Sequence, residues 1–485
     1  MPYTPTIGLE IHAELDTKSK MFCSCKNDSR EIKPNVNVCP VCLAHPGTLP
    51  VINKEAVKKV IKAGIALNCQ INKETFFERK NYFYPDLPKG YQISQYALPL
   101  TKKGFLEIKG KKIRITRIHL EEDTGRLIHP KDKNYSLVDF NRAGLPLMEL
   151  VTEADISSGR ETKEFAKNLQ LILRYLEVSK ADMEKGEMRV EVNISLSKDK
   201  NKGTKVEIKN LNSIKAAGEA IDYEITRQKE LLEKGKKIIQ ETRGWSDKDK
   251  KTFSQRKKEE SHDYRYFTEP DLPPLKIEDD FLAEIKKEIP ELPNSKRKRF
   301  KEQYGLDEKQ IELYVYQKDL GEFFEKVVSE LGNWLKVKKR KIAKKKFIKL
   351  ASNYLTTDLQ ELLKEKSDFK EEDLKITPEN FAELIAMVYN KEISSRIAKN
   401  LLKIMFKKGG DPSQIIKEEN MTLIEDQKEI RKSVKEVIEE NPKAMEDYNE
   451  GKKTVVKFLV GQVMRKTRGK ADPKKIIEII EEILS

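Results

Sequence analysis

The sequence predicts an α+β protein: a mixed α/β domain with a mostly antiparallel sheet, followed by a helical half. Up to about residue 293, short stretches alternate apolar and polar residues between glycine and proline turns. Beyond that point the alternation stops and amphipathic helical periodicity takes over, with few prolines. Because strands repeat every 2.0 residues and helices every 3.6, the change of period separates the two halves.

Three stretches of strict alternation stand out among the predicted strands: residues 6–15, 189–195 and 205–209. Their polar sides carry the groups Glu10, His12, Glu14, Glu191 and Glu207. Acids that recur on one face of several strands indicate the floor of a cation or phosphate site. The alternative is the solvated face of an antiparallel sheet, since 36% of this chain is charged.

Helical periodicity predicts the remaining elements. In the first half the candidates span residues 158–176 and 212–233; Asn212 or Ser213 can cap the second, and Gly235 ends it. Further candidates span residues 284–288, 308–330, 381–389 and 394–406, with about four more beyond the break at 408–412. We therefore expect a mixed domain over residues 1–293, a helical domain over 294–407 and a helical tail over 408–485.

The charge balance favours a polyanionic partner, most often nucleic acid. Lys and Arg number 95 against 80 Asp and Glu, which gives a net charge of +15. Nine of the fourteen residues at 336–349 are basic; this run suits either a solvated helix face or phosphate contact. No apolar run approaches the length of a membrane span and no leader peptide is evident, so we expect a cytoplasmic protein without a membrane partner.

Four of the five cysteines have the spacing of a metal site. Cys23 and Cys25 precede Cys39 and Cys42, and the second pair forms a Cys-x-x-Cys knuckle. Four thiolates complete a closed tetrahedral site that suits structural zinc. The first pair is Cys-x-Cys, which departs from the usual spacing, and two unrelated free pairs are the alternative.

Further acids cluster away from the first strand. Residues 118–125 contain Glu121, Glu122 and Asp123 ahead of a glycine, and Glu149 lies in an apolar segment. An acid among apolar neighbours is costly unless it is paired or bound to a cation. Carboxylates converging from separate strands suit Mg²⁺ with nucleotide phosphates, although histidine is an unusual Mg²⁺ ligand.

Two segments are dense in ligand-binding side chains. Residues 79–96 hold five aromatic and several cationic groups, which can stack on bases and contact phosphates, or can form an irregular loop that seals the core. Residues 254–274 are rich in groups that bind phosphate. Neither a Gly-x-x-x-x-Gly-Lys loop nor a Gly-x-Gly-x-x-Gly motif occurs, so ATP would bind outside the common nucleotide folds.

These segments, in this order, resemble the GatB family, which supplies the B subunit of the tRNA-dependent amidotransferases. The resemblance runs from residue 7 nearly to the C-terminus. It is carried by residues 8–12, 39–42, 82–96, 119–123, 138–144, 207–213, 262–267, 459–464 and 467–471.

The resemblance implies a cradle-shaped α/β domain, a helical domain and a tRNA-binding tail. It also implies a ligase that phosphorylates the side-chain carboxylate of Glu-tRNA(Gln) or Asp-tRNA(Asn) with ATP. Ammonia, released from glutamine by the glutaminase or A subunit, then displaces the phosphate, and the small C subunit joins the two larger ones. Which of the two tRNAs is the substrate stays open.

The resemblance also implies site residues. Glu10, His12, Glu122 and Glu149 would surround Mg²⁺. The expected nucleotide-binding residues are Lys80, Tyr82, Lys89, Glu207, Lys209 and Arg256. Glu191 stands where the family usually has aspartate, which puts a direct metal role in doubt, and Glu14 is expected to stay a solvated acid.

Two other functions compete with the catalytic one. The chain could be a non-catalytic tRNA-binding subunit whose chemistry lies in a partner, or a zinc-stabilised structural subunit. The acids discriminate between them, because a pure polyanion binder gains nothing from converging carboxylates beside phosphates.

Overall fold

The computed structural model describes most of the chain, in two compact units. The described residues are 3–198, 203–257, 263–337, 344–363, 374–419, 421, 427–449, 452, 454–467 and 469–484, with backbone alone at 256–257, 333–337 and 449. The first unit ends at Pro293 and the second begins at Asn294, which is where the periodicity of the sequence changes.

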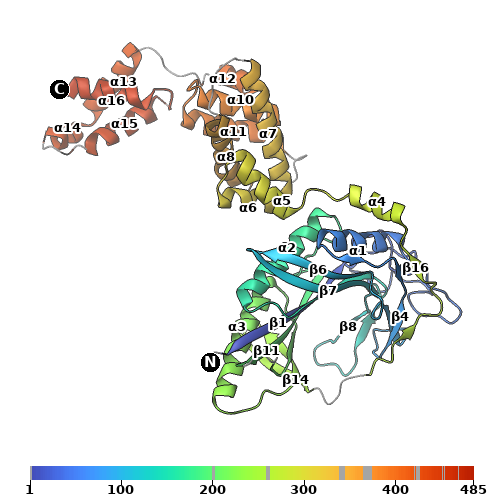
Figure 1. Cartoon of the computed structure of the whole chain (residues 1–485). Coiled ribbons are helices and arrows are strands. Elements are labelled where there is room, and N and C mark those ends of the chain that lie inside the picture. The colour runs from blue at the N-terminus through green and yellow to red at the C-terminus, as the bar shows by residue number, and fades with distance from the viewer. Residues whose placement is uncertain are drawn as a thin grey trace. The chain divides into compact units, whose positions relative to one another are not determined.

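A nine-stranded sheet forms the centre of the first unit (Figure 1). In spatial order its strands are β14 (Lys251–Lys257), β13 (Glu241–Ser246), β12 (Val206–Lys209), β11 (Met188–Ser197), β1 (Thr4–Glu14), β10 (Pro146–Thr152), β7 (Lys111–Glu122), β6 (Thr101–Ile108) and β2 (Gln70–Ile71). Every pair is antiparallel except β12 with β13. The predicted fold class is therefore confirmed.

Three helices cover one face of this sheet (Figure 1): α1 (Lys54–Ala66), α2 (Gly159–Tyr175) and α3 (Ile214–Glu233). Each begins at a side-chain cap, from Asn53, Ser158 and Ser213 respectively. They pack on the apolar side of the strands, where Ile7, Leu9 and their neighbours are fully buried. The polar side of the central strands is thereby left facing away from the helices.

Short strands lie off that other side (Figure 1). One three-stranded sheet has the order β15 (Phe267–Thr268), β4 (Glu78–Asn81) and β5 (Tyr91–Ser94). Two pairs complete the set: β3 (Glu74–Thr75) with β16 (Leu275–Lys276), and β8 (Arg126–Ile128) with β9 (Leu137–Asp139). The unit closes with α4 (Asp279–Lys287).

The second unit is helical throughout its described residues. Its first part comprises α5 (Pro293–Arg299), a π-helical turn (Phe300–Tyr304), α6 (Glu308–Tyr316), α7 (Lys318–Val337), α8 (Lys344–Tyr354), a second π-helical turn (Leu355–Leu359), α9 (Gln360–Leu363), α10 (Pro378–Tyr389), α11 (Ser395–Lys408) and α12 (Pro412–Glu418). The single helix expected over 308–330 is wrong, because Gln317 leaves helical geometry and separates α6 from α7.

The last four helices have a core of their own: α13 (Gln427–Glu440), α14 (Pro442–Asn449), α15 (Thr454–Lys466) and α16 (Pro473–Leu484). Its fully buried members include Ile430, Val434, Leu459, Val463, Ile476 and Ile480. In contrast, α12 packs against α10 and α11. Among the described helices, none is long and apolar enough to cross a bilayer.

Candidate active site

The polar faces of four adjacent strands join into one row. In the register of the sheet, His12 on β1 lies between Arg189 on β11 and Glu149 on β10, and Glu149 lies opposite His119 on β7. Two residues along, Glu10 pairs in the same way with Glu191. Because side chains alternate across a strand, all of these groups emerge on the side away from the covering helices.

His12 is the centre of this cluster. Its Nε2 lies 3.3 Å from Oε1 of Glu121, 3.4 Å from Oε2 of Glu149 and 3.9 Å from Oε1 of Glu10. Ligand atoms of Glu10, His12 and Glu149 all lie within 4.8 Å of one another, which is the spacing of a cation site. The structure therefore brings together three of the four residues expected around Mg²⁺.

A second group of possible metal ligands shares Glu149. It comprises His119, Glu121 and Glu149, all buried and again within 4.8 Å. His119 Nε2 is 3.6 Å from Oε2 of Glu149 and 3.9 Å from Oε2 of Glu121. The sequence placed Glu121 in an acidic segment suited to Mg²⁺, but neither Glu121 nor His119 was among the residues expected around the ion. The alternation of residues 117–121 with the buried Ile118 and Leu120 is the signal that could have found them.

Charge coupling sets the protonation of the cluster. Burial, aided by the charge of Glu149, raises the pKa of Glu10 to about 6. Burial alone would lower the pKa of His12, but its contacts with Glu121 and Glu149 raise it well above the usual value. Burial likewise opposes ionisation of Glu121 and Glu149, yet the two histidines hold both of their pKa values below the usual range. The cluster thus keeps carboxylates charged in a buried setting.

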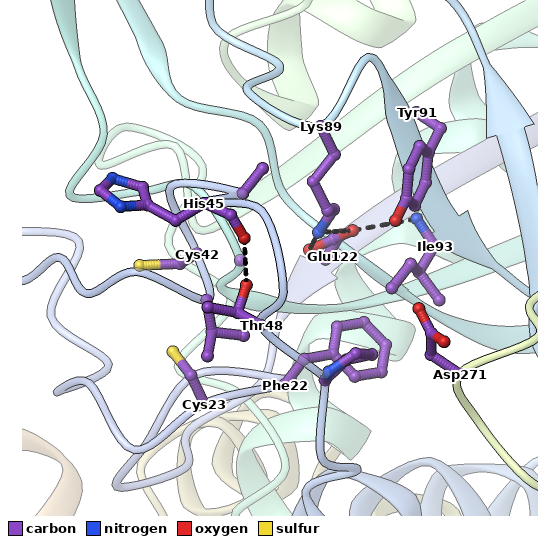
Figure 2. A pocket seen from close by; sticks show the side chains of 14 residues that line it. Phe22, Cys23, Cys42, His45, Thr48, Lys89, Tyr91, Ile93, Glu122 and Asp271 are labelled. Carbon is purple, nitrogen blue, oxygen red and sulfur yellow. Dashed lines mark hydrogen bonds and ion pairs between the residues drawn. The ribbon is translucent and has the colours of Figure 1, made fainter.

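Glu122 lies elsewhere, although it was expected with Glu10, His12 and Glu149. It is ion-paired with Lys89, and its Oε1 accepts a hydrogen bond of 3.0 Å from the backbone N–H of Ile93. Figure 2 shows Glu122 and Lys89 pointing toward one another in the wall of a cavity of about 160 Å³. The physical reason is alternation: Glu121 shares the face of His119, so the next residue points away.

The neighbouring strands extend the row with paired charges. Lys209 Nζ lies 2.9 Å from Oε2 of Glu191 and 3.6 Å from Oε1 of Glu207, and Glu207 accepts a 2.8 Å hydrogen bond from Thr242. The expected nucleotide-binding residues Glu207 and Lys209 therefore border the acidic cluster through Glu191. The side chains of Arg256 and Lys336 lie outside the described part of the chain, as do His262 and residues 338–343 of the basic run.

Glu14 corrects an expectation. It was predicted to be a solvated acid, but it is only 9% exposed and is ion-paired with Arg142. Arg142 also donates a 2.6 Å hydrogen bond to Asp123, which accepts another of 3.0 Å from Arg189. No sequence pattern indicated this network, because its members come from distant segments.

Aromatic rings surround Lys80, one of the expected nucleotide-binding residues. Its Nζ lies 5.0 Å from the ring centroid of Tyr264 and 5.9 Å from that of Tyr82, which was expected to bind nucleotide as well. Burial opposes the charge of Lys80, but the nearby carboxylates, led by Glu121, raise its pKa. The segment of residues 79–96, which contains Lys80, does more than seal the core, because the side chain of Phe83 within it is 90% exposed.

The four clustered cysteines come together in the first unit. Their sulfur atoms lie within 4.8 Å of one another, and Sγ of Cys39 is 3.9 Å from Sγ of Cys42. Sulfur atoms around tetrahedral zinc lie about 3.8 Å apart, so the geometry fits. The contact between Cys23 and Cys42 lowers the pKa of Cys42 and raises that of Cys23, so the two thiols share a proton between them until a metal replaces it.

Comparisons with known proteins agree over the whole chain. The family profile described as the GatB/GatE catalytic domain matches residues 5–283, and one described as a GatB domain matches residues 337–484. A protein of Thermotoga maritima, named as the B subunit of aspartyl/glutamyl-tRNA(Asn/Gln) amidotransferase, is 47% identical over 500 residues, which cover 100% of this chain and 99% of that protein. Proteins of the same name from Caldicellulosiruptor bescii and Persephonella marina are each 46% identical, and the matches cover 100% of this chain and 99% and 100% of those proteins.

Proposed function

We propose, from the premise that this chain belongs to the GatB family, that it is the component of a tRNA-dependent amidotransferase that activates a tRNA-borne carboxylate. Its substrates are Glu-tRNA(Gln), Asp-tRNA(Asn) or both. The observation that supports a catalytic role is the row of half-buried Glu10 and His12 with buried Glu149, whose ligand atoms lie within 4.8 Å of one another. A protein that only bound tRNA would have no use for these acids beside RNA phosphates.

The reaction has two steps. An oxygen of the side-chain carboxylate attacks the γ-phosphorus of ATP, and ADP leaves. Ammonia then attacks the acyl carbon, phosphate leaves, and the new amide loses a proton. Ammonia would come from glutamine hydrolysed by the glutaminase component, and the small third component would join the two. As a step of protein synthesis, the reaction belongs in the cytoplasm.

The donor set fits a divalent cation. Carboxylates of Glu10 and Glu149 provide oxygen ligands, and either His12 or water can complete the shell. Buried Nδ1 of His119 has no hydrogen-bond partner among the described residues, which suits a site completed by a ligand. When bound, Mg²⁺ supplies charge neutralisation for the phosphates.

The chain's own cations would bind the anionic substrates beside the acids. Lys80 projects near Glu121 and Glu149, and Lys209 near Glu191, so positive charge lies on two sides of the row. The rings of Tyr82 and Tyr264 lie within reach of the Lys80 ammonium and help to hold it in place. These groups orient the phosphates and the carboxylate; they need not move a proton.

The cysteine cluster would hold a structural zinc ion. Its four ligands are protein thiols, so no position stays open for substrate. The buried ammonium of Lys20 donates hydrogen bonds to Sγ of Cys42, at 3.7 Å, and to the carbonyl of Ala143, at 2.7 Å. The cluster is thereby fastened to the segment just before β10, which carries Glu149.

Amide formation in the assembled enzyme tests this function. The complex with its partner subunits receives ATP, Mg²⁺, Glu-tRNA(Gln) and ammonium in place of glutamine, which bypasses the glutaminase. Glu149→Gln should lower the rate by about 100-fold or more, whereas Glu164→Gln, on the outer helix α2, should not change it. An unchanged rate in Glu149→Gln would mean that the chain only binds tRNA.

A further inference from the structure

Buried polar atoms without a partner gather on the polar face of the sheet. Leaving aside Oε2 of Glu191, which lies 2.9 Å from Nζ of Lys209, five such side-chain atoms occur in the part of the chain that the structure describes. Three of them, Nε of Arg117, Nδ1 of His119 and Oδ1 of Asn193, belong to residues of β7 and β11 beside the acids. Because buried donors and acceptors are normally satisfied, this concentration indicates that a ligand completes them.

A β-bulge turns Arg117 toward this face. In the pairing of β7 with β10, Arg117 lies opposite Val151 and Ile115 lies opposite Thr152, so Thr116 is an extra residue. Ile113 and Ile115 face the core, and without the bulge Arg117 would follow them. The extra residue shifts the alternation, so that Ile118 faces the core and Arg117 shares the face of His119. Bulges commonly redirect side chains beside functional sites.

The guanidinium of Arg117 is held in place but lightly bonded. It lies 5.3 Å from the ring centroid of Tyr96, which stacks at 4.8 Å on Tyr266. Nη2 lies 3.5 Å from Oε1 of Glu149, which is long for an ion pair. Arg114 on the same strand is different, because its Nε and Nη2 donate to both oxygens of Asp155 at 2.9 and 2.7 Å.

We propose that Arg117 binds an oxyanion of the substrates beside Glu149, a role that rests on the function proposed above. The guanidinium presents a planar pair of N–H donors that matches a carboxylate or a phosphate. The ligand is either the γ-phosphate of ATP or the side-chain carboxylate carried by the tRNA, since the two share this chemistry. Tyr96, supported by its stacking on Tyr266, packs against the guanidinium, and Glu149 links it to the acidic row.

Steady-state kinetics of the complete complex, with ammonium as nitrogen donor, test this role. Arg117→Lys keeps the positive charge but loses the planar pair of N–H donors. Arg117→Gln loses both the charge and the pair of donors. Each should lower kcat/KM by about 10- to 100-fold, with Gln the more severe. Arg114→Lys and Arg114→Gln are the matched controls and should behave as wild type. If the ligand is phosphate, KM for ATP rises; if it is the carboxylate, KM for the aminoacyl-tRNA rises.

A binding measurement keeps the test independent of turnover. A non-hydrolysable ATP analogue is titrated with Mg²⁺ present. If Arg117 binds the γ-phosphate, Arg117→Gln should bind the analogue more weakly than wild type. If Arg117 binds the carboxylate of the aminoacyl-tRNA, the variant should bind the analogue as wild type does. The inference is overturned if both Arg117 variants keep wild-type kcat/KM for both substrates. A wild-type complex that forms no amide would instead refute the proposed function, so the two failures are distinguishable.

Discussion

At the scale of single residues, strand alternation decides which acids belong to the candidate site. Glu10 and His12 could be singled out from the sequence because they alternate with apolar residues, and Glu149 because it lies within an apolar segment. The choice between Glu121 and Glu122 could not be made from their chemistry, which is identical. It depends on which residues of β7 face the polar side of the sheet, and the bulge at Thr116 changes which ones do.

The first prediction separates these two adjacent acids. Glu121→Gln removes a carboxylate that lies 3.3 Å from His12 and should weaken binding of Mn²⁺, a spectroscopic substitute for Mg²⁺, by about 10-fold or more. Glu122→Gln should leave Mn²⁺ affinity unchanged, because that carboxylate is ion-paired with Lys89. Electron paramagnetic resonance of free Mn²⁺ measures both. Equal weakening by the two variants would contradict the placement of Glu122 outside the cluster.

At the scale of elements, caps and turns made α2 and α3 of the first unit predictable, whereas α1, which Asn53 caps, was not among the expected helices. Ser158 and Ser213 begin α2 and α3 close to the expected positions. Breaks without a glycine or proline were not predictable: Gln317 interrupts a continuous amphipathic pattern because its backbone turns to ψ 83°. The bulge in β7 is visible only as a spacing of three between Ile115 and Ile118, which a short pattern does not distinguish from a helix.

The cysteine knuckle gives a second prediction. The purified chain should contain one zinc ion, and Cys39→Ser should lose it and lower the thermal midpoint, because zinc binding contributes directly to folding. Cys69→Ser is the matched control, since the sulfur of Cys69 lies outside the four-cysteine group. Elemental analysis together with thermal unfolding checks both. Wild-type zinc content in Cys39→Ser would rule out the four-sulfur site.

The helical unit gives a third prediction, on pH. Burial works against ionisation of Glu325 on α7, but its hydrogen bond to Arg299 lowers its pKa below the usual 4.5. The folded pKa is therefore below the unfolded one, so the pair stabilises the unit above about pH 4.5 and this contribution is lost as pH falls further. Since the pair is partly exposed, we expect about 1 kcal/mol.

Comparison of Glu325→Gln with wild type in acid unfolding measures this contribution. Near pH 7 the free energy of unfolding of the variant should be about 1 kcal/mol lower than that of wild type, and below pH 4 the two should converge. Glu322→Gln, whose contact with Lys318 is 3.9 Å, is the control on the same helix. A constant difference between Glu325→Gln and wild type at all pH values would contradict the assigned cause.

At the scale of the whole molecule, the chain combines parts with separate cores. The change of period near residue 293 made the main division predictable, and the break at residues 408–412 suggested a third part. The place of α12 was not predictable, because its buried Ile415 and Ile416 pack with α10 and α11 although a Gly-Gly-Asp-Pro break precedes it. The core of α13–α16 is made without it.

This arrangement gives a fourth prediction. Removal of residues 427–485, which spares α12, should leave the rest folded and weaken tRNA binding with a reduced dependence on salt, because fewer phosphates are neutralised. Glutaminase activity of the complex should persist. Filter binding over a salt series measures the effect. Unchanged affinity at every salt concentration would mean that the tail does not contact tRNA.

The central claim is that the acidic row transfers a phosphoryl group to the tRNA-borne carboxylate. Its most direct test is transfer of label from [γ-³²P]ATP to Glu-tRNA(Gln) by the assembled complex in a single turnover without any ammonia source. Wild type should give labelled aminoacyl-tRNA that is lost on adding ammonium, and Glu149→Gln should give about 100-fold less. Equal labelling by wild type and Glu149→Gln would contradict the account.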